Sequence, residues 1–310
     1  MFRYLKEYRW ADMRQMLANN RAEPHESCIR MDGKLCVVTG CTSGVGWQTA
    51  RRLAAHGAQV VMVNRSVEKS ERARDVLAAE YGADCTYVIA DFADLNQVRE
   101  TAHILRETYE RIDLLVNNVG MHSTRLTRTS DGRETVFCVN HLAPFTLTWL
   151  LLDAMRRSAP ARILQVNSQG HRFGGLDTND LDWRGRHYTG LRGYGASKTA
   201  QLLCVWRLSE MLAGSGVTIN AVHPGEVRSN IGSNNGPLYR WFKDKILSRS
   251  LGNPAKSGQA IHYLATEPEL AKVSGVYFNL THPERPAPHA LDSDVGKRIW
   301  DETLRLTGLG

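Results

Sequence analysis

Residues 35–46 read LCVVTGCTSGVG, and this stretch decides the fold. Residues 35–39 are apolar or β-branched, which predicts a strand that is buried on both faces. Glycines follow at Gly40, Gly44 and Gly46, and a helical pattern begins directly after them. A chain that turns sharply, brings its backbone close to a phosphate and starts a helix against a sheet needs residues without a Cβ at such points. Because a helix start presents unpaired N–H groups, the stretch predicts a strand, a phosphate-binding turn and a helix, with a purely structural turn as the alternative.

Short apolar runs alternate with longer helical patterns along the rest of the chain. Six further runs predict strands, at 59–63, 85–90, 112–118, 162–167, 217–222 and 275–278. Strand and helix repeated in this way indicate a parallel sheet with helices on both faces. We therefore predict an α/β fold with a doubly wound, Rossmann-like, mostly parallel seven-stranded sheet. Residues 34–310 are predicted to form this single domain, and residues 1–33 a helical extension.

The extension carries an imperfect amphipathic pattern. Its apolar residues gather on one side of a helical wheel, namely Phe2, Leu5, Met13, Met16 and Leu17, with Trp10 at the margin. The pattern predicts a helix that packs on its own domain or on a partner subunit. Binding to a membrane surface through residues 1–20 and a frayed tail are the alternatives.

Composition and charge limit the partners and the compartment. The chain has 310 residues, of which 42% are hydrophobic and 23% charged, as in an ordinary globular protein. A net charge of +7 fits nucleic acid, an anionic membrane or an anionic cofactor, but the basic residues form no run of five, so nucleic-acid binding is not expected. The six cysteines show no C-x-x-C spacing, so we expect reduced thiols, no metal site and a cytoplasmic protein. No apolar stretch of about 18 residues is found, so no transmembrane helix is expected.

The end of the second predicted strand reads Val63-Asn64-Arg65-Ser66. An acidic residue here would bind a ribose hydroxyl and select NAD(H), whereas Arg65 neutralises a 2′-phosphate and Asn64 and Ser66 can donate hydrogen bonds to it. NADP(H) is therefore the predicted cofactor and NAD(H) the alternative. Asp91, followed by Phe92, is placed to meet the adenine, although a helix cap at Asp91 or Asp94 explains the same residues.

Six motifs occur in one order along the chain: T-G-x-x-x-G-x-G at 39–46, N-N-x-G at 117–120, Asn140, Ser168, Y-x-x-x-K at 194–198 and P-G at 224–225. This order resembles the short-chain dehydrogenase/reductase family over about residues 34–280. The 25 residues between Ser168 and Tyr194, the motif D-G-x-E-x-x-F-x-V-N-H-L at 131–142 and the closing stretch 297–309 resemble its branch of retinol dehydrogenases and the WW-domain oxidoreductase.

The chemistry of such a family explains the choice of residues. A hydride that reaches or leaves a carbon must be matched by a proton on the attached oxygen, and free tyrosine, with a pKa of ~10, is a poor base near neutrality. Lys198 lies one helical turn from Tyr194 and, with the oxidised nicotinamide, is expected to lower the pKa of Tyr194. The resemblance further implies that Lys198 holds the nicotinamide ribose, that Ser168 holds the substrate oxygen and that Asn140 anchors a water in a proton relay.

Together the turn and the resemblance predict a set of cofactor-binding residues. They are Gly40, Thr42, Ser43, Gly44, Val45, Gly46, Asn64, Arg65, Asp91, Phe92, Asn118, Val119, Gly120, Tyr194, Lys198, Pro224, Gly225, Val227 and Ser229. Ser229 stands near the position where the family often has a threonine that contacts the carboxamide.

The resemblance implies an NADP(H)-dependent oxidoreductase that interconverts an alcohol and a ketone or aldehyde. The segment at about 226–256 is expected to form a lid, and its aromatic and aliphatic residues favour a bulky, lipophilic substrate, with a helix docked on the body or a membrane contact as alternatives. Residues 135–155 and 194–212 are apolar enough to join a homodimer or homotetramer, although burial within one chain explains much of that apolarity. A non-catalytic NADP(H)-binding regulatory or scaffold protein is the alternative function.

Overall fold

The computed structural model describes residue 4, residues 7–225 and residues 254–310. Its strands form one sheet in the order β3-β2-β1-β4-β5-β6-β7-β8. Their bounds are β1 Leu35–Thr39, β2 Gln59–Asn64, β3 Cys85–Ile89, β4 Leu114–Asn117, β5 Ala161–Val166, β6 Val217–His223, β7 Tyr277–Asn279 and β8 His282–Pro283. The seven predicted strands are confirmed and pair in parallel. The eighth, β8, pairs antiparallel with β7 and has two residues, too few for a periodic pattern.

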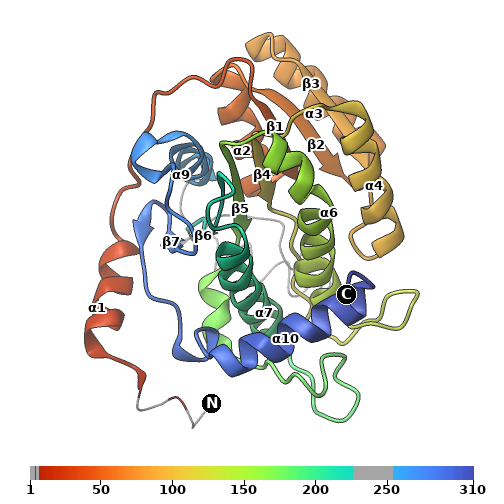
Figure 1. The fold of residues 1–310 in the computed structure, drawn as a ribbon, viewed down its shortest axis with the longest axis vertical. Helices are drawn as coiled ribbons and strands as arrows, with labels where there is room; N and C mark the ends of the chain where they lie inside the picture. The colour runs from red at the N-terminus through yellow and green to blue at the C-terminus, as the bar shows by residue number, and fades with distance from the viewer. Residues whose placement is uncertain (1–3, 5–6, 226–253) are drawn as a thin grey trace.

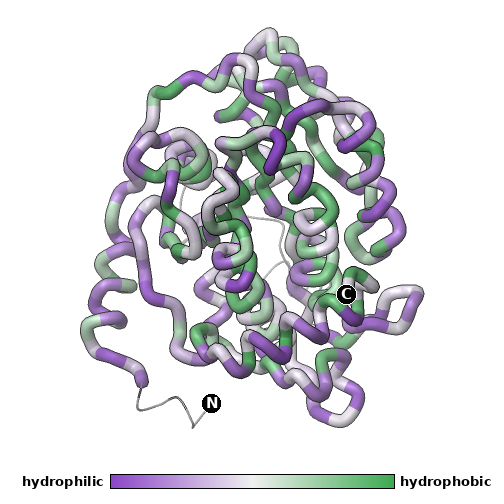
Figure 2. The backbone as a smooth tube through the Cα atoms, viewed as in Figure 1, coloured by the Kyte–Doolittle hydropathy of each residue, from purple (hydrophilic) through white to green (hydrophobic). Residues whose placement is uncertain are grey.

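Helices cover both faces of the sheet (Figure 1). Their bounds are α1 Trp10–Asn19, α2 Gly44–Ala55, α3 Val67–Tyr81, α4 Leu95–Thr108, α5 Thr135–Phe137, α6 Ala143–Arg157, α7 Gly190–Met211, α9 Pro254–Thr266 and α10 Ser293–Thr307. One buried cluster joins the sheet to α4, α6, α7 and α10, and a second joins it to α2, α3 and α9. Figure 2 shows hydrophobic residues concentrated along the central strands and α6, in agreement with a doubly wound α/β fold.

The last helix, α10, lies across α7 and beside α6 (Figure 1). The ring of Trp300 packs edge-on against Phe145, with ring centroids 5.4 Å apart, and lies 5.7 Å from that of Trp149. His141 and Thr303 are joined by a hydrogen bond of 2.8 Å. The chain's own C-terminal helix therefore covers part of the apolar surface that predicted self-association.

A continuous helical stretch, Thr135–Arg157, joins α5, a five-residue π-helix at Cys138–Leu142 and α6. By length and composition it could cross a membrane, contrary to the expectation that no such stretch exists. However, 83% of its most apolar window is buried inside the fold, so it serves here as a core helix.

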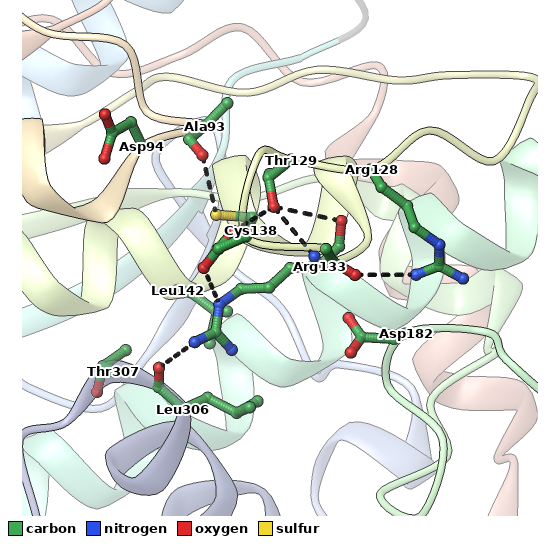
Figure 3. Close-up of polar contacts among 12 residues, drawn as sticks. Ala93, Asp94, Arg128, Thr129, Arg133, Cys138, Leu142, Asp182, Leu306 and Thr307 are labelled. Carbon is green, nitrogen blue, oxygen red and sulfur yellow. Dashed lines mark hydrogen bonds and ion pairs between the residues drawn. The ribbon is translucent and has the colours of Figure 1, made fainter.

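The loop before this helix is fixed to the C-terminal end of α10 (Figure 3). The Arg133 guanidinium donates to the carbonyl oxygen of Leu306 at 2.7 Å, and the Arg133 backbone N–H donates to the Thr129 hydroxyl at 3.0 Å. Glu134 then caps the helix, because its carboxylate accepts from the backbone N–H groups of Val136 and Phe137 at 2.9 and 2.6 Å. These contacts place the start of the helix that carries Asn140.

The N-terminal helix α1 lies along the β7–β8 edge of the molecule (Figure 1). It is anchored by its polar side, where Asp12 pairs with Arg285 at 3.1 Å and Asn19 donates to Glu284 at 3.3 Å. Its large apolar side chains are exposed, to 78% at Trp10, 41% at Met13 and 51% at Leu17. Helix α1 thus packs on the rest of the chain through polar rather than apolar contacts, whereas Met31, later in the extension, is buried in the core; Phe2 and Leu5 lie outside the described residues.

Candidate active site

The turn after β1 is shaped by glycines at points of close approach. Gly40 and Gly44 have φ of +72° and +59°, in the left-handed region that favours glycine. A Cβ on Gly46 would lie 2.2 Å from the carbonyl oxygen of Gly40, so the first turn of α2 requires glycine there. Ser43, the residue before α2, makes no side-chain hydrogen bond to the helix, which leaves the first N–H groups of α2 free of that cap. This geometry suits an anionic group.

Two asparagines from neighbouring strands hold the turn. The Asn64 Oδ1, at the end of β2, accepts from the Cys41 backbone N–H at 2.6 Å. The Asn118 Nδ2, after β4, donates to the carbonyl oxygens of Thr39 and Gly40 at 2.8 and 3.1 Å. Because the sheet order reverses between β1 and β4, the turn lies at the switch point where open α/β sheets bind ligands.

The residues predicted to meet a 2′-phosphate differ in exposure. Asn64 is 3% exposed and braces the turn, and Ser66 caps α3 by accepting from the Lys69 backbone N–H at 3.4 Å. The Arg65 side chain is 73% exposed and its guanidinium lies 3.9 Å from the Asp91 carboxylate. Arg65 is therefore the residue of this group that remains available to an incoming anion.

The predicted adenine contacts have local structural duties as well. The Asp91 carboxylate accepts from the Ala93 backbone N–H at 2.9 Å, and Asp94 caps α4 by accepting from Asn96 at 2.9 Å. The Phe92 side chain is 4% exposed and belongs to the core, so a cofactor contact there would come from its backbone.

The carboxyl end of β5 and the first turns of α7 bring three predicted residues together. Ser168 follows β5, and its Oγ and Tyr194 Cε1 lie on either side of Gly170, at 3.3 and 2.4 Å from the position of a Cβ on that residue. The Lys198 ammonium lies 5.8 Å from the Tyr194 ring centroid, as the spacing of one helical turn predicts. Its Nζ donates to the carbonyl oxygen of Val166 at 3.0 Å and to Gln201 Oε1 at 3.0 Å.

Burial dominates the ionisation of this cluster. It lowers the pKa of Lys198 to about 7, because the charged ammonium loses its hydration. Burial also raises the pKa of Tyr194, while the hydrogen bond from Ser168 acts in the opposite direction. The predicted lowering of the Tyr194 pKa is thus not found in the protein alone, since desolvation outweighs the hydrogen bond.

Gly170 is a residue of this site that the motifs did not indicate. A Cβ there would lie 2.4 Å from Tyr194 Cε1 and 3.3 Å from Ser168 Oγ. The Tyr194 ring therefore rests directly against the backbone of Gly170. The only sign of it in the sequence was a glycine two residues after Ser168. Its role becomes visible only when the position of the Tyr194 ring is known.

Asn140 lies in the π-helix and is fully buried. Its Oδ1 accepts from the Met121 backbone N–H at 2.7 Å, and its Nδ2 donates to the Met121 carbonyl oxygen and to Ser197 Oγ, both at 3.0 Å. Its backbone carbonyl accepts from Gln201 Nε2. Asn140 thus ties Met121, the residue after N-N-x-G, to α7. Val119 and Gly120 close that motif, and a Cβ on Gly120 would lie 3.8 Å from Lys198 Nζ.

The chain leaves β6 through Pro224 and Gly225, which has a φ of +83°. Ser257, on α9, donates to the Pro224 carbonyl oxygen at 2.6 Å. Val227, Ser229 and most of the predicted lid lie outside the described residues. Within the described part of the chain, no group of three or more His, Cys, Asp or Glu side chains could hold a metal ion.

A family model described as short chain dehydrogenase matches residues 34–237, which is more than half of the chain. The chain belongs to the short-chain dehydrogenase/reductase family. It is 40% identical over 282 residues to the human protein Retinol dehydrogenase 13, covering 89% of this chain and 85% of that one. This family member is therefore an oxidoreductase that acts on CH–OH donors with NAD(P), close to the retinol dehydrogenase branch.

Solved structures agree with this assignment. An uncharacterized protein from Mycobacterium paratuberculosis superposes with a TM-score of 0.73 at 27% identity, covering 90% of this chain and 95% of that one. A short chain dehydrogenase from Burkholderia cenocepacia in complex with NADP gives a TM-score of 0.64 at 25% identity, with 81% and 97% covered. A nicotinamide cofactor fits the glycine turn of this family member, where free N–H groups and the missing Cβ atoms leave room for a pyrophosphate.

Proposed function

We propose that this chain is an NADP(H)-dependent oxidoreductase that interconverts an alcohol and a ketone or aldehyde, with Tyr194 as the proton donor and acceptor. The observation that carries the proposal is the cluster that the Ser168 hydroxyl and the Tyr194 ring form beside the buried ammonium of Lys198. Two hydroxyl groups and a cation thus meet at the carboxyl end of β5, on the same edge of the sheet as the glycine turn. Asn140 supports the site through its bonds to Met121 and Ser197.

The proposed chemistry follows from the roles that these side chains can take. When bound, the nicotinamide supplies a hydride to a carbonyl carbon or accepts one from an alcohol carbon. The Tyr194 hydroxyl donates its proton to the carbonyl oxygen as negative charge develops there, and takes a proton back in the oxidative direction. The Ser168 hydroxyl holds the same oxygen, and the Lys198 ammonium stabilises the tyrosinate.

The preference for NADP(H) rests on Arg65. Its guanidinium is exposed, and its ion pair to the Asp91 carboxylate is long at 3.9 Å. An ion pair this exposed contributes little, so Arg65 can bind another anion. The end of β2 has Asn64 where an acidic residue would select NAD(H). We expect the backbone of the glycine turn, and that of Pro224 and Gly225, to make the remaining predicted contacts with the cofactor.

A bulky, hydrophobic substrate is proposed for this site. Phe173 and Leu191 are exposed large apolar side chains, at 47% and 56%, and they lie near the two ends of the segment that joins Ser168 to Tyr194. The relative named Retinol dehydrogenase 13 makes retinoids a reasonable part of the first panel. We expect kcat/KM to rise with the apolar size of the alcohol or aldehyde.

Turnover by Tyr194→Phe tests the proposal. The variant keeps the aromatic ring but lacks the hydroxyl group that would donate the proton, so we expect kcat/KM to fall by about 100-fold or more. The Kd for NADPH, measured by fluorescence, should stay close to that of the wild type. Tyr109→Phe is the matched control, because the Tyr109 hydroxyl also forms a hydrogen bond, 2.8 Å to Thr86, far from the site.

Two results would contradict the proposal. Full activity of Tyr194→Phe with intact NADPH binding would remove tyrosine from the mechanism. Tight NADPH binding by the wild type without turnover of any alcohol or carbonyl compound in a broad panel would favour the regulatory or scaffold protein.

Self-association and location stay predictions. Because α10 covers α7, a homodimer or homotetramer would use another surface or displace α10, and sedimentation velocity measures which state forms. A cytoplasmic location with peripheral membrane contact is supported by the outward apolar residues Trp10, Met13 and Leu17 of α1. Cell fractionation with a carbonate wash distinguishes a protein that stays in the cytoplasm from one that is bound to the membrane surface.

A further inference from the structure

Gln201 joins the three polar elements around Lys198. It is 3% exposed and follows Lys198 by three residues on α7. Its Oε1 accepts from Lys198 Nζ and from Asn167 Nδ2, both at 3.0 Å. Its Nε2 donates to the backbone carbonyl of Asn140. One amide side chain therefore links the lysine, the end of β5 and the π-helix.

The two ends of this amide have different partners, and the difference determines which residue type can stand here. Oε1 receives two donors at once, and Nε2 supplies one donor to a carbonyl oxygen. An apolar side chain would leave buried donors on Lys198 and Asn167 without this acceptor, which is unfavourable, above all for a charged group. A carboxylate would keep the acceptor but lose the donor to Asn140.

The Lys198 ammonium depends on neutral acceptors. Its three N–H groups have two protein partners, the Val166 carbonyl and Gln201, which leaves one for the site. In the described part of the chain no carboxylate pairs with Lys198. The titratable side chains around it are Tyr194 on α7 and His141 on the π-helix, whose pKa burial lowers to about 3, so His141 is neutral near pH 7.

We propose that Gln201 is a positioning residue that holds Lys198 Nζ in place and in its ammonium form, and so sets the pH range in which Tyr194 exchanges its proton. An amide does not release a proton near neutral pH, so the contribution is geometric and electrostatic rather than a proton transfer. The inference rests on the proposed function of Tyr194 and Lys198.

The test measures the Kd for NADPH between pH 5 and pH 10, without turnover, by fluorescence titration. A lysine that holds the nicotinamide ribose binds better when charged, so affinity weakens as pH rises through the Lys198 pKa. Gln201→Met removes the acceptor and should move this transition about one pH unit lower, whereas Gln201→Glu adds an anionic acceptor and should move it higher by a similar amount. Opposite shifts are not expected from a purely structural role.

Gln165→Met is the matched control. Gln165 is also buried, on β5, but its amide lies 3.5 Å from the Asn117 carbonyl and no hydrogen bond joins it to Lys198. This control should keep the wild-type transition, and kcat/KM at pH 8 should fall about tenfold in Gln201→Met only.

The proposal is overturned if the transition has the same pH in the wild type, Gln201→Met and Gln201→Glu, or if Gln165→Met shifts it equally. If Gln201→Met does not fold by circular dichroism, the direction of the Gln201→Glu shift decides. Opposite shifts in a protein that turns over no substrate would support the role of Gln201 on Lys198 and reject the proposed function, so the two failures are distinguishable.

Discussion

The contact between Gly170 and Tyr194 makes a sharp prediction about positioning. In Gly170→Ala the new Cβ would lie 2.4 Å from Tyr194 Cε1, whereas ordinary contacts begin at 3.4 Å, so the ring or the loop must move by about 1 Å. A displacement of this size at a reacting group lowers the rate by about 100-fold. The overpacking should also lower the free energy of unfolding by about 1–3 kcal/mol.

The assay compares kcat/KM, the Kd for NADPH and urea unfolding for the wild type and Gly170→Ala. We expect the rate to fall about 100-fold while cofactor binding changes little, because the glycine turn lies on other strands. Gly185→Ala is the control in the same insertion, since a Cβ there would meet only Asp180 Oδ2, at 3.9 Å. A Gly170→Ala protein with wild-type kcat/KM would refute the view that the ring is held against this backbone.

Three further predictions concern the cofactor, pH and the last helix. Arg65→Ser should lower kcat/KM with NADPH by about 10-fold or more and leave the value with NADH nearly unchanged, because the guanidinium contributes a charge-assisted bond to the 2′-phosphate; equal losses with both cofactors would contradict this. Burial raises the pKa of Glu134 to about 7, so the folded state holds its proton more tightly than the unfolded state, and this contribution to stability is lost as pH rises from about 4.5 to about 7. Glu134→Gln has no carboxyl to titrate, so the free energy of unfolding of the wild type should fall relative to that of the variant by about 2–3 kcal/mol between pH 5 and pH 8 in urea unfolding; a constant difference would argue against a buried titrating carboxyl. Trp300→Ala should lower the free energy of unfolding by about 3–5 kcal/mol, since this 8% exposed ring packs on Phe145 and Trp149, and a loss under 1 kcal/mol would mean that α10 is not part of the core.

Local periodicity in the sequence was enough to predict the frame of the molecule. Seven strands, the glycine turn at 40–46 and the spacing of Tyr194 and Lys198 depend on neighbours within a few residues, and the structure places each of them as expected. The division at residue 33 stays a prediction. Side-chain type and order along the chain were also enough to indicate the family, because its six motifs occur in one order along the sequence.

Contacts between residues far apart in the chain were decided only by the tertiary structure. Three contacts join different elements: the bond from the Cys41 N–H to Asn64, the packing of Tyr194 against Gly170 and the bond from Gln201 to Asn140. The same holds for α10, which covers helices that looked free to bind a partner, and for the polar anchoring of α1. The physical reason is that periodicity reports which face of an element is apolar, whereas its neighbour, and hence the partner of each buried polar group, is set by how the layers pack.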